Sequence, residues 1–313
     1  MPDYFKNVEE IGNCLPSEQI ETNVVFYLNW GLLNIGSFFN VTIPTSGSYG
    51  GNQHILRLSE DPNYTKGQVW EGFRKDWVWE SGLNYSVQPI SISGVYINGA
   101  YVPASSVGQY SHKIDYPNGR IIFDSAISSN TQVSCEYSYR YIQVNNIDNS
   151  PWFKRLQFDS FRVDDSHFNL YGSGSWSLHP SQRLQLPTIV IRSIPNAYKD
   201  GYEIGNNSLW NRQEFHFYLL AETNNDLMKM FDVITLQKDS VIRTFDKNEL
   251  RNNDDFPLKF DGSIGDTSKT YPQLADAYPG KTIRFVDFKG IAFDEQLPFY
   301  ASTLRGLLEV IVP

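Results

Sequence analysis

Cysteine is almost absent from this sequence, which has only Cys14 and Cys135 among its 313 residues. Two cysteines so far apart give no reason to expect a disulfide framework, so we expect a reducing compartment. No stretch is apolar over the length that a membrane-spanning helix needs, and the N-terminus lacks the apolar core of a signal peptide. The sequence therefore predicts no membrane partner, and it predicts a buried thiol at Cys135 on the strand face of Val133 and Tyr137.

Basic residues are in deficit. The chain has 26 Lys and Arg against 35 Asp and Glu, which gives a net charge of −9 and a pI of about 5.1. This balance argues against electrostatically driven nucleic-acid binding as the main function. A duplex that passes through an acidic ring is repelled from its walls and slides, so the charge is compatible with a DNA conduit.

Sequence motifs of catalysis are missing as well. There is no Gly-x-Ser-x-Gly elbow, Walker loop or Rossmann glycine pattern, and neither cysteine has a partner base. The five histidines lack metal-ligand spacing, and the one cluster to weigh is Asp164, Asp165, His167 and His179. A solvated polar loop is favoured there over a cation site. We expect no enzyme, and no catalytic, cofactor-binding or metal-binding residue.

The tryptophan-rich segment from Trp70 to Glu80 leaves one alternative of another class open, a carbohydrate-binding or carbohydrate-cleaving protein. A sugar ring would stack on Trp77 or Trp79, and Glu71 and Glu80 would form the carboxylate pair. In a strand, Trp77 and Trp79 share one face, which equally suits a core or a subunit interface. The interface is the favoured interpretation.

Aromatic residues are abundant, with 20 Phe, 19 Tyr and 7 Trp making up 15% of the chain. Such side chains fill β-sheet cores, and the Tyr and Trp rings also suit large protein interfaces because they bury area while keeping a polar group. The candidate subunit-interface residues are Trp30, Trp70, Trp77, Trp79, Trp176 and Phe231.

The N-terminal part predicts one long helix from Pro16 to about Gly36. Pro16-Ser17-Glu18 is a helix start signal, and apolar residues recur at helical spacing after it. Because the helix is apolar on nearly all sides, we expect it to be sandwiched between partners, in this chain or in a neighbouring subunit.

The segment from Gln88 to Val144 predicts antiparallel β-structure. Asn98-Gly99 lies between alternating strands and is the pair that a type I′ hairpin turn needs, and Pro117-Asn118-Gly119 repeats the device. Thr131 to Val144 alternates buried-type residues and predicts one long strand. Together these segments predict a small sandwich or half-barrel.

The segment from Leu186 to Leu250 predicts two strands, a helix and a further strand. The second strand, Arg212 to Ala221, places Phe215, Phe217 and Leu219 on one face. Thr223-Asn-Asn-Asp226 has the form of a capping box and predicts a helix that runs to Lys238. The further strand is Ser240 to Asp246, which has strand composition. The final stretch Leu304 to Val312 also has strand composition, and we expect it to be pinned in the core.

This order resembles the tail terminator and neck proteins of tailed bacteriophages, through Gly201-Tyr-Glu-Ile-Gly205 before a strand and a helix that leads to Ile242-Arg-Thr-Phe-Asp246. The segment Asp115-Tyr-Pro-Asn-Gly-Arg-Ile-Ile-Phe-Asp124 is similar to segments of phage virion structural proteins. In that family, a mixed sheet flanked by helices forms rings, usually of six subunits, that cap the tail tube and join it to the head. The resemblance leaves about half of the chain unexplained.

The expected fold is α+β and β-rich, a tail-terminator-like mixed sheet flanked by helices with an inserted small antiparallel β-sandwich. The expected units are an N-terminal segment over 1–87 that packs on the C-terminal domain, the β-sandwich over 88–147, and a ring-forming α+β domain over 148–313.

The resemblance implies a virion protein in the neck, assembled in the bacterial host cytoplasm as a homo-oligomeric ring, usually a hexamer. Its partners would be the connector, tail tube and sheath proteins, with genomic DNA passing through the lumen without sequence recognition. Loops around Ser46 to Gly51 and Asp164 to Trp176 would clasp adjacent rings. A baseplate or collar component is the alternative within the same class.

Overall fold

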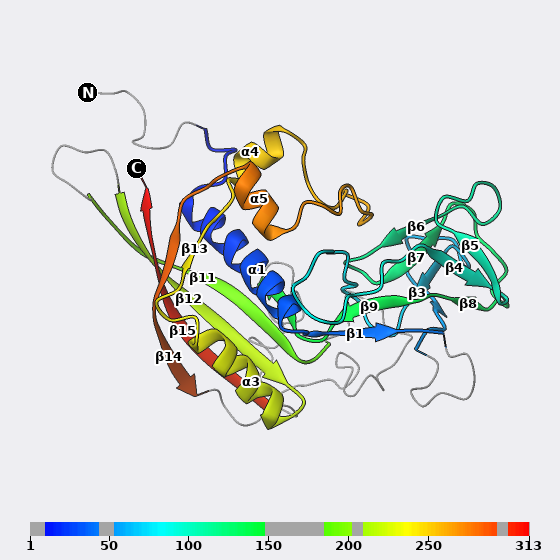
Figure 1. The fold of residues 1–313 in the computed structure, drawn as a ribbon, viewed down its shortest axis with the longest axis horizontal. Coiled ribbons are helices and arrows are strands. Elements are labelled where there is room, and N and C mark those ends of the chain that lie inside the picture. Colours follow the sequence, from blue (N-terminus) through cyan, green and yellow to red (C-terminus); the bar gives the residue numbers. More distant parts are fainter. Residues whose placement is uncertain (1–9, 44–52, 148–184, 202–208, 293–299, 313) are drawn as a thin grey trace.

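The computed structural model describes residues 10–43, 53–147, 185–201, 209–292 and 300–312. The architecture is α+β and rich in β-structure, as expected. Figure 1 shows a large sheet covered by helices at one end of the molecule and a group of smaller sheets at the other.

The large sheet is mixed and has six strands in the order β10-β11-β12-β15-β14-β13. Its first pair, β10 with β11, is parallel, and the other pairs are antiparallel. The last strand of the chain lies between β12 and β14, which confirms the prediction of a terminal strand pinned in the core. The strands are β10 (Gln143–Asn146), β11 (Thr188–Gly201), β12 (Leu209–Ala221), β13 (Val241–Ile242), β14 (Ile283–Ala292) and β15 (Tyr300–Val312).

Helix α1 (Pro16–Asn34) lies across this sheet, and the sandwiched helix predicted from its sequence is confirmed. One side buries Ile20, Val24, Leu28 and Leu32 in the core of the sheet. The other side packs Phe26 and Trp30 against a second cluster, built from the segment that carries α4 (Lys247–Asn252) and α5 (Tyr271–Ala277). Both partners of the helix therefore belong to this chain.

Helix α3 (Asn224–Thr235) covers the same face of the sheet further along (Figure 1). Its N-cap is Thr223, whose hydroxyl oxygen accepts a hydrogen bond from the Asp226 backbone N–H at 3.1 Å, so the predicted cap is present. Leu227, Met230 and Ile234 point into the core of the sheet. The helix ends at Thr235, earlier than the predicted Lys238.

The smaller sheets share one apolar core, which includes Trp70, Trp77 and the fully buried Cys135, as predicted for the thiol. Their strands are β1 (Phe38–Val41), β2 (Arg57–Leu58), β3 (Val69–Glu71), β4 (Gly94–Ile97), β5 (Ala100–Pro103), β6 (His112–Asp115), β7 (Arg120–Phe123), β8 (Val133–Ser134) and β9 (Tyr137–Arg140). We call this group, Phe38 to Arg140, the β-unit. The strands on either side of Gln88, where a unit boundary was expected, pair with each other, β3 with β7 and β1 with β9.

The two predicted hairpin turns differ. Asn98 and Gly99 have φ of 50° and 84° between β4 and β5, which confirms the two-residue turn with both residues left-handed. The loop between β6 and β7 has four residues, Tyr116 to Gly119, and only Gly119 has positive φ there. The second hairpin is present, but it does not repeat the first turn.

The prediction of one strand from Thr131 to Val144 is wrong. The segment forms three short strands with different partners: β8 pairs with β4, β9 with β1, and β10 with β11. Burial alternates little here, because Tyr137, Ser138, Tyr139 and Arg140 are all buried. Each change of partner interrupts the ladder, and this is why the strand breaks.

Two smaller expectations need correction or lie elsewhere. The strand predicted over Ser240 to Asp246 shortens to β13. The loops 46–51 and 164–176, which were expected to clasp neighbouring rings, lie outside the described residues.

Candidate functional site

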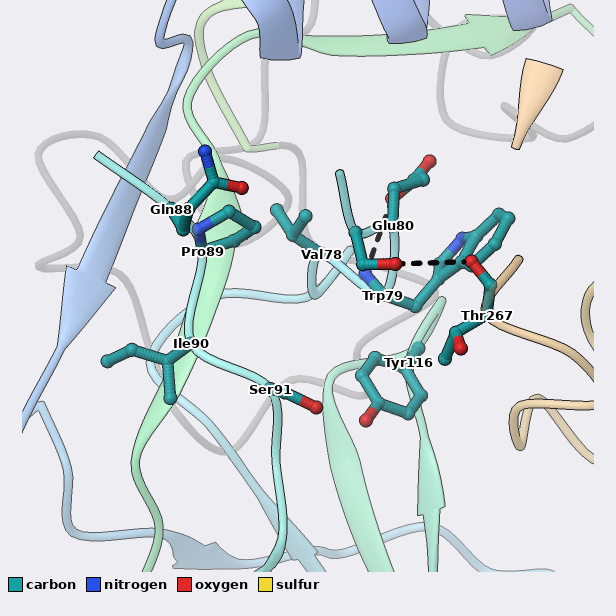
Figure 2. Close-up of a pocket in the computed structure, with 10 residues that line it drawn as sticks. Val78, Trp79, Glu80, Gln88, Pro89, Ile90, Ser91, Tyr116 and Thr267 are labelled. Atoms are coloured by element: carbon teal, nitrogen blue, oxygen red, sulfur yellow. Dashed lines mark hydrogen bonds between the residues drawn. The ribbon is translucent and has the colours of Figure 1, made fainter. Parts of the chain in front are cut away.

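The Trp79–Glu80 segment lines a small cavity on the β-unit. Its volume is about 210 Å³, below the roughly 300–1,000 Å³ typical of ligand pockets. Figure 2 shows Gln88, Pro89 and Ile90 along one side and Trp79 with Thr267 along another. The full lining is Val78, Trp79, Glu80, Ser81, Gln88, Pro89, Ile90, Ser91, Tyr116 and Thr267.

The carboxylate that lines this cavity is committed to a buried ion pair. Arg140 Nη2 donates to Glu80 Oε1 at 2.6 Å and Arg140 Nε donates to Asp76 Oδ1 at 3.1 Å. Burial opposes the charge on Arg140, but the carboxylates of Glu80 and Asp76 outweigh it and raise the pKa of Arg140 above its ordinary value. Arg140 and Glu80 are both buried, so Glu80 serves to neutralise this cation.

The second carboxylate of the carbohydrate hypothesis lies elsewhere. Glu71 sits in β3, is buried, and accepts a hydrogen bond from the Ser59 hydroxyl at 2.5 Å. It does not line the cavity. A glycosidase needs two accessible carboxyl groups on either side of one glycosidic bond, and Glu71 with Glu80 do not form such a pair.

Two of the candidate interface residues are core residues of the β-unit. Trp70 is 4% exposed and donates its indole N–H to the Gly67 carbonyl at 3.1 Å. Trp77 is fully buried, and its ring stacks on Tyr137 with 4.4 Å between ring centroids. Trp77 and Trp79 do not share a strand face, because the segment between β3 and β4 forms no strand, only a bridge from Trp77 to Tyr139. Neither Trp70 nor Trp77 offers surface to a neighbour.

The other candidates keep partial exposure or are not described. Trp30 is part of α1 and packs against two apolar clusters, one around Leu33 and Val78 and one around Phe245. Phe231 packs on the core of the sheet. Trp79 packs at the border of the β-unit core. Trp176, together with Asp164, Asp165, His167 and His179, lies outside the described residues. Among the residues that the structure does describe, no group of His, Cys, Asp and Glu gathers to hold a metal ion.

The feature with most potential for assembly is the pair of strands that border the large sheet. On one side, β10 pairs only with Thr188 to Ile191 of β11, and no described strand continues along β11 from Arg192 to Gly201. On the other side, β13 pairs only with Ile283 and Arg284 of β14. Beyond the bulge between Phe285 and Asp287, no described strand pairs with the outer edge of β14. Such edges carry unpaired N–H and C=O groups that another chain can pair with.

A buried arginine joins the β-unit to the sheet. Arg74 Nη2 donates to the Leu186 carbonyl at 2.7 Å, just before β11, and its guanidinium lies 5.6 Å from the centroid of the Tyr139 ring. Burial lowers the pKa of Arg74, because the charged form loses its hydration. This contact could not be predicted from local sequence patterns, because Arg74 and Leu186 are 112 residues apart.

No protein-family model matches this sequence, and no curated protein matches it either. None of the described helices is long and apolar enough to cross a membrane.

Proposed function

We propose that this chain is a structural component of a tailed-phage virion, an oligomeric ring of the tail-terminator type in the neck, which joins the tail tube to the head and forms part of the DNA conduit. In this proposal the large sheet with α1 and α3 is the tail-terminator-like, ring-building part. The β-unit is an inserted small sandwich that decorates the ring. No residue has a catalytic role.

The observation that carries the proposal is a pair of strand edges, on opposite sides of one sheet, along which no described strand pairs. If the edge of β14 in one subunit pairs with β11 of the next, the contact is head-to-tail, and such a contact closes into a ring when the rotation between subunits allows it. The strands β11, β12, β15 and β14 alternate in direction, so this pairing continues the antiparallel order. The resemblance of Leu186 to Leu250 to neck proteins supports the same function.

The free stretches constrain the geometry of such a ring. Arg192, where this part of β11 begins, is in register with Lys289 across the sheet. The residues that follow lie level with the first half of β14, where Ala197 is in register with Phe285, whereas the uncovered part of β14 begins after its bulge. The two free stretches are therefore offset along the strand direction. Pairing them requires neighbouring subunits to be staggered, as in barrels whose strands tilt about the axis.

Cysteine crosslinking tests the edge contact. In one chain, positions 197 and 289 are at least three strand spacings apart, about 14 Å. The test variant carries Ala197→Cys and Lys289→Cys in a Cys14→Ser background. A thiol crosslinker shorter than this distance is expected to join different chains of the variant into a ladder of oligomers. The matched control replaces Lys289→Cys with Lys229→Cys on α3 and should give no ladder. Equal crosslinking in both variants would contradict the edge contact.

Position in the particle tests the function itself. Antibody against the full chain should label purified virions at the junction of head and tail, seen by gold particles in electron micrographs, and pre-immune serum is the control. Label at the distal end of the tail would favour the baseplate alternative. Absence of the chain from purified virions would contradict the proposal.

A further inference from the structure

The large sheet carries a row of basic side chains that are distant in the sequence. Arg192 of β11 is the register partner of His216 of β12, His216 is the partner of Arg305 of β15, and Arg305 is the partner of Lys289 of β14. Adjacent strands are about 4.8 Å apart, so the row spans about 14 Å. We call these four residues the basic row.

The basic row faces away from α1 and α3. Side chains alternate between the two faces of a strand, and the neighbours Phe217 and Leu304 point into the core beneath the helices. Arg305 and Lys289 are exposed, and Arg192 and His216 are half-buried. The row therefore lies on the opposite face of the sheet, which no described helix covers and which we call the helix-free face. Next to the row on this face Val190, Tyr218 and Thr303 are buried, so the exposed part is the strip that carries Arg305 and Lys289.

Like charges directly opposite each other destabilise a sheet, and only part of this charge is neutralised within the described chain. Glu214 contacts two members: its Oε1 is 3.1 Å from His216 Nε2, and its Oε2 is 2.5 Å from Arg305 Nη2. Neither Arg192 nor Lys289 forms an ion pair with a described residue. Among the described side chains, three permanent cations thus face two carboxylates, Glu214 and Asp287, and Asp287 is shared between Lys289 and Lys238.

The charges around the row are balanced among themselves. Asp287 pairs with Lys238 at 3.1 Å, and Arg284 pairs with Asp239 at 2.8 Å. The excess positive charge therefore belongs to the row, in a chain whose net charge is −9. A local positive row on an acidic protein indicates an anionic partner at this face.

We propose that the basic row binds the phosphate backbone of a DNA duplex, and that the exposed part of the helix-free face, around Arg305 and Lys289, lines the conduit. The inference rests on the proposed function and adds to it the face that meets DNA. Duplex DNA carries one phosphate per strand for about every 3.4 Å of axis, so a straight row of about 14 Å always meets several phosphates. An acidic protein would need carboxylates placed to match the row, whereas a phosphate backbone presents charge at every position. The acidic remainder of the chain keeps the contact weak, which lets the duplex move.

Salt dependence of DNA binding tests the row. Binding of a fluorescent 30-base-pair duplex to the full chain is followed by anisotropy at several salt concentrations. Three phosphate contacts predict a slope of about −2.7 in log K against log salt, or about 40-fold weaker binding at 200 mM than at 50 mM. Lys289→Gln should reduce that change to about 12-fold, because one contact is lost. Lys229→Gln, at an exposed lysine on α3 over the opposite face of the sheet, should leave the slope unchanged.

Three outcomes overturn the inference: no binding at low salt, equal slopes for Lys289→Gln and Lys229→Gln, or polyglutamate competing as well as DNA at equal charge. The last would assign the row to an acidic protein. Arg192→Gln is a second variant, and it avoids the Arg305–Glu214 pair, whose loss also disturbs folding. Virion labelling is independent of this assay. If virions are labelled but DNA binding does not depend on the row, only the inference about the row is refuted. If DNA binding depends on the row but virions are not labelled, only the neck function is refuted.

Discussion

At the scale of single residues, the strongest electrostatic arrangement described is the buried Arg140 with Asp76 and Glu80. Its partners precede it by 64 and 60 residues. No local pattern could reveal this, because Arg140 occupies a strand whose neighbours are aromatic and Asp76 adopts a φ of 60° in an irregular segment. Cys135, in contrast, was predictable, since its apolar neighbours on the same strand face place it in the core.

Arg140→Met should lower the free energy of unfolding by about 3–5 kcal/mol, because two carboxylates lose the cation that compensates for their burial. Urea denaturation at pH 7, followed by tryptophan fluorescence, measures the change. Lys113→Met removes an ion pair to Asp261 whose side chains are 58% and 38% exposed, and should cost no more than about 1 kcal/mol. Adding Asp76→Asn and Glu80→Gln to Arg140→Met should recover part of the loss. Equal effects of the Arg140 and Lys113 variants would show that the buried pair is unimportant.

At the scale of elements, the sequence predicted best where one local signal decides. The Asn98-Gly99 turn, the Thr223 cap and the amphipathic strand β12 depend on neighbouring residues only. The prediction of one strand from Thr131 to Val144 failed because the alternation of its residues does not indicate which strands pair with it. The row across β11, β12, β15 and β14 was hidden for the same reason, since register between distant strands is a property of the folded sheet.

Gly306 shows how tightly β15 is packed. A Cβ added there would lie 2.7 Å from Phe217 Cε2 and 3.1 Å from Phe288 Cε1. Gly306→Ala should therefore destabilise the protein by about 1–3 kcal/mol through overpacking. Gly290→Ala in β14 is the matched control, because its Cβ would meet Phe231 Cε2 at 3.4 Å, an ordinary contact. Denaturant midpoints should fall for the first variant and stay within about 1 kcal/mol of wild type for the second. A lower midpoint for Gly290→Ala than for Gly306→Ala would contradict this packing.

At the scale of the whole molecule, the large sheet is assembled from both ends of the sequence. Helix α1 supplies one layer of its core, and Val144 of β10 with Ile142 just before it lies at one side. The predicted packing of the N-terminal helix on the C-terminal part is therefore present, but the expected units over 1–87 and 148–313 do not coincide with single cores. The position in a virion and the ring itself stay predictions.

A fragment over 148–313 should fail to unfold cooperatively, because it lacks α1 and β10 and leaves apolar side chains such as Ile189 and Phe215 uncovered. Circular dichroism during urea titration measures this, with the full chain as the reference. The same fragment supplied with a separate chain over 1–147 should regain a cooperative transition if the missing layer is the only cause. A sharp transition of the fragment alone, at the midpoint of the full chain, would show that the N-terminal layer is dispensable.

The place of β15 between β12 and β14 also sets an order in time. While the chain is being synthesised, β12 can pair with β11, but its other side waits until the residues of β14 and then of β15 have left the ribosome. Until then β12 has an apolar face and a bare edge, both of which favour association with other nascent chains. The same insertion that completes the sheet brings β14 into place. If the proposed ring forms, its subunits would become competent to join only after synthesis has passed β15, so synthesis of the chain and assembly of the ring would be separate steps.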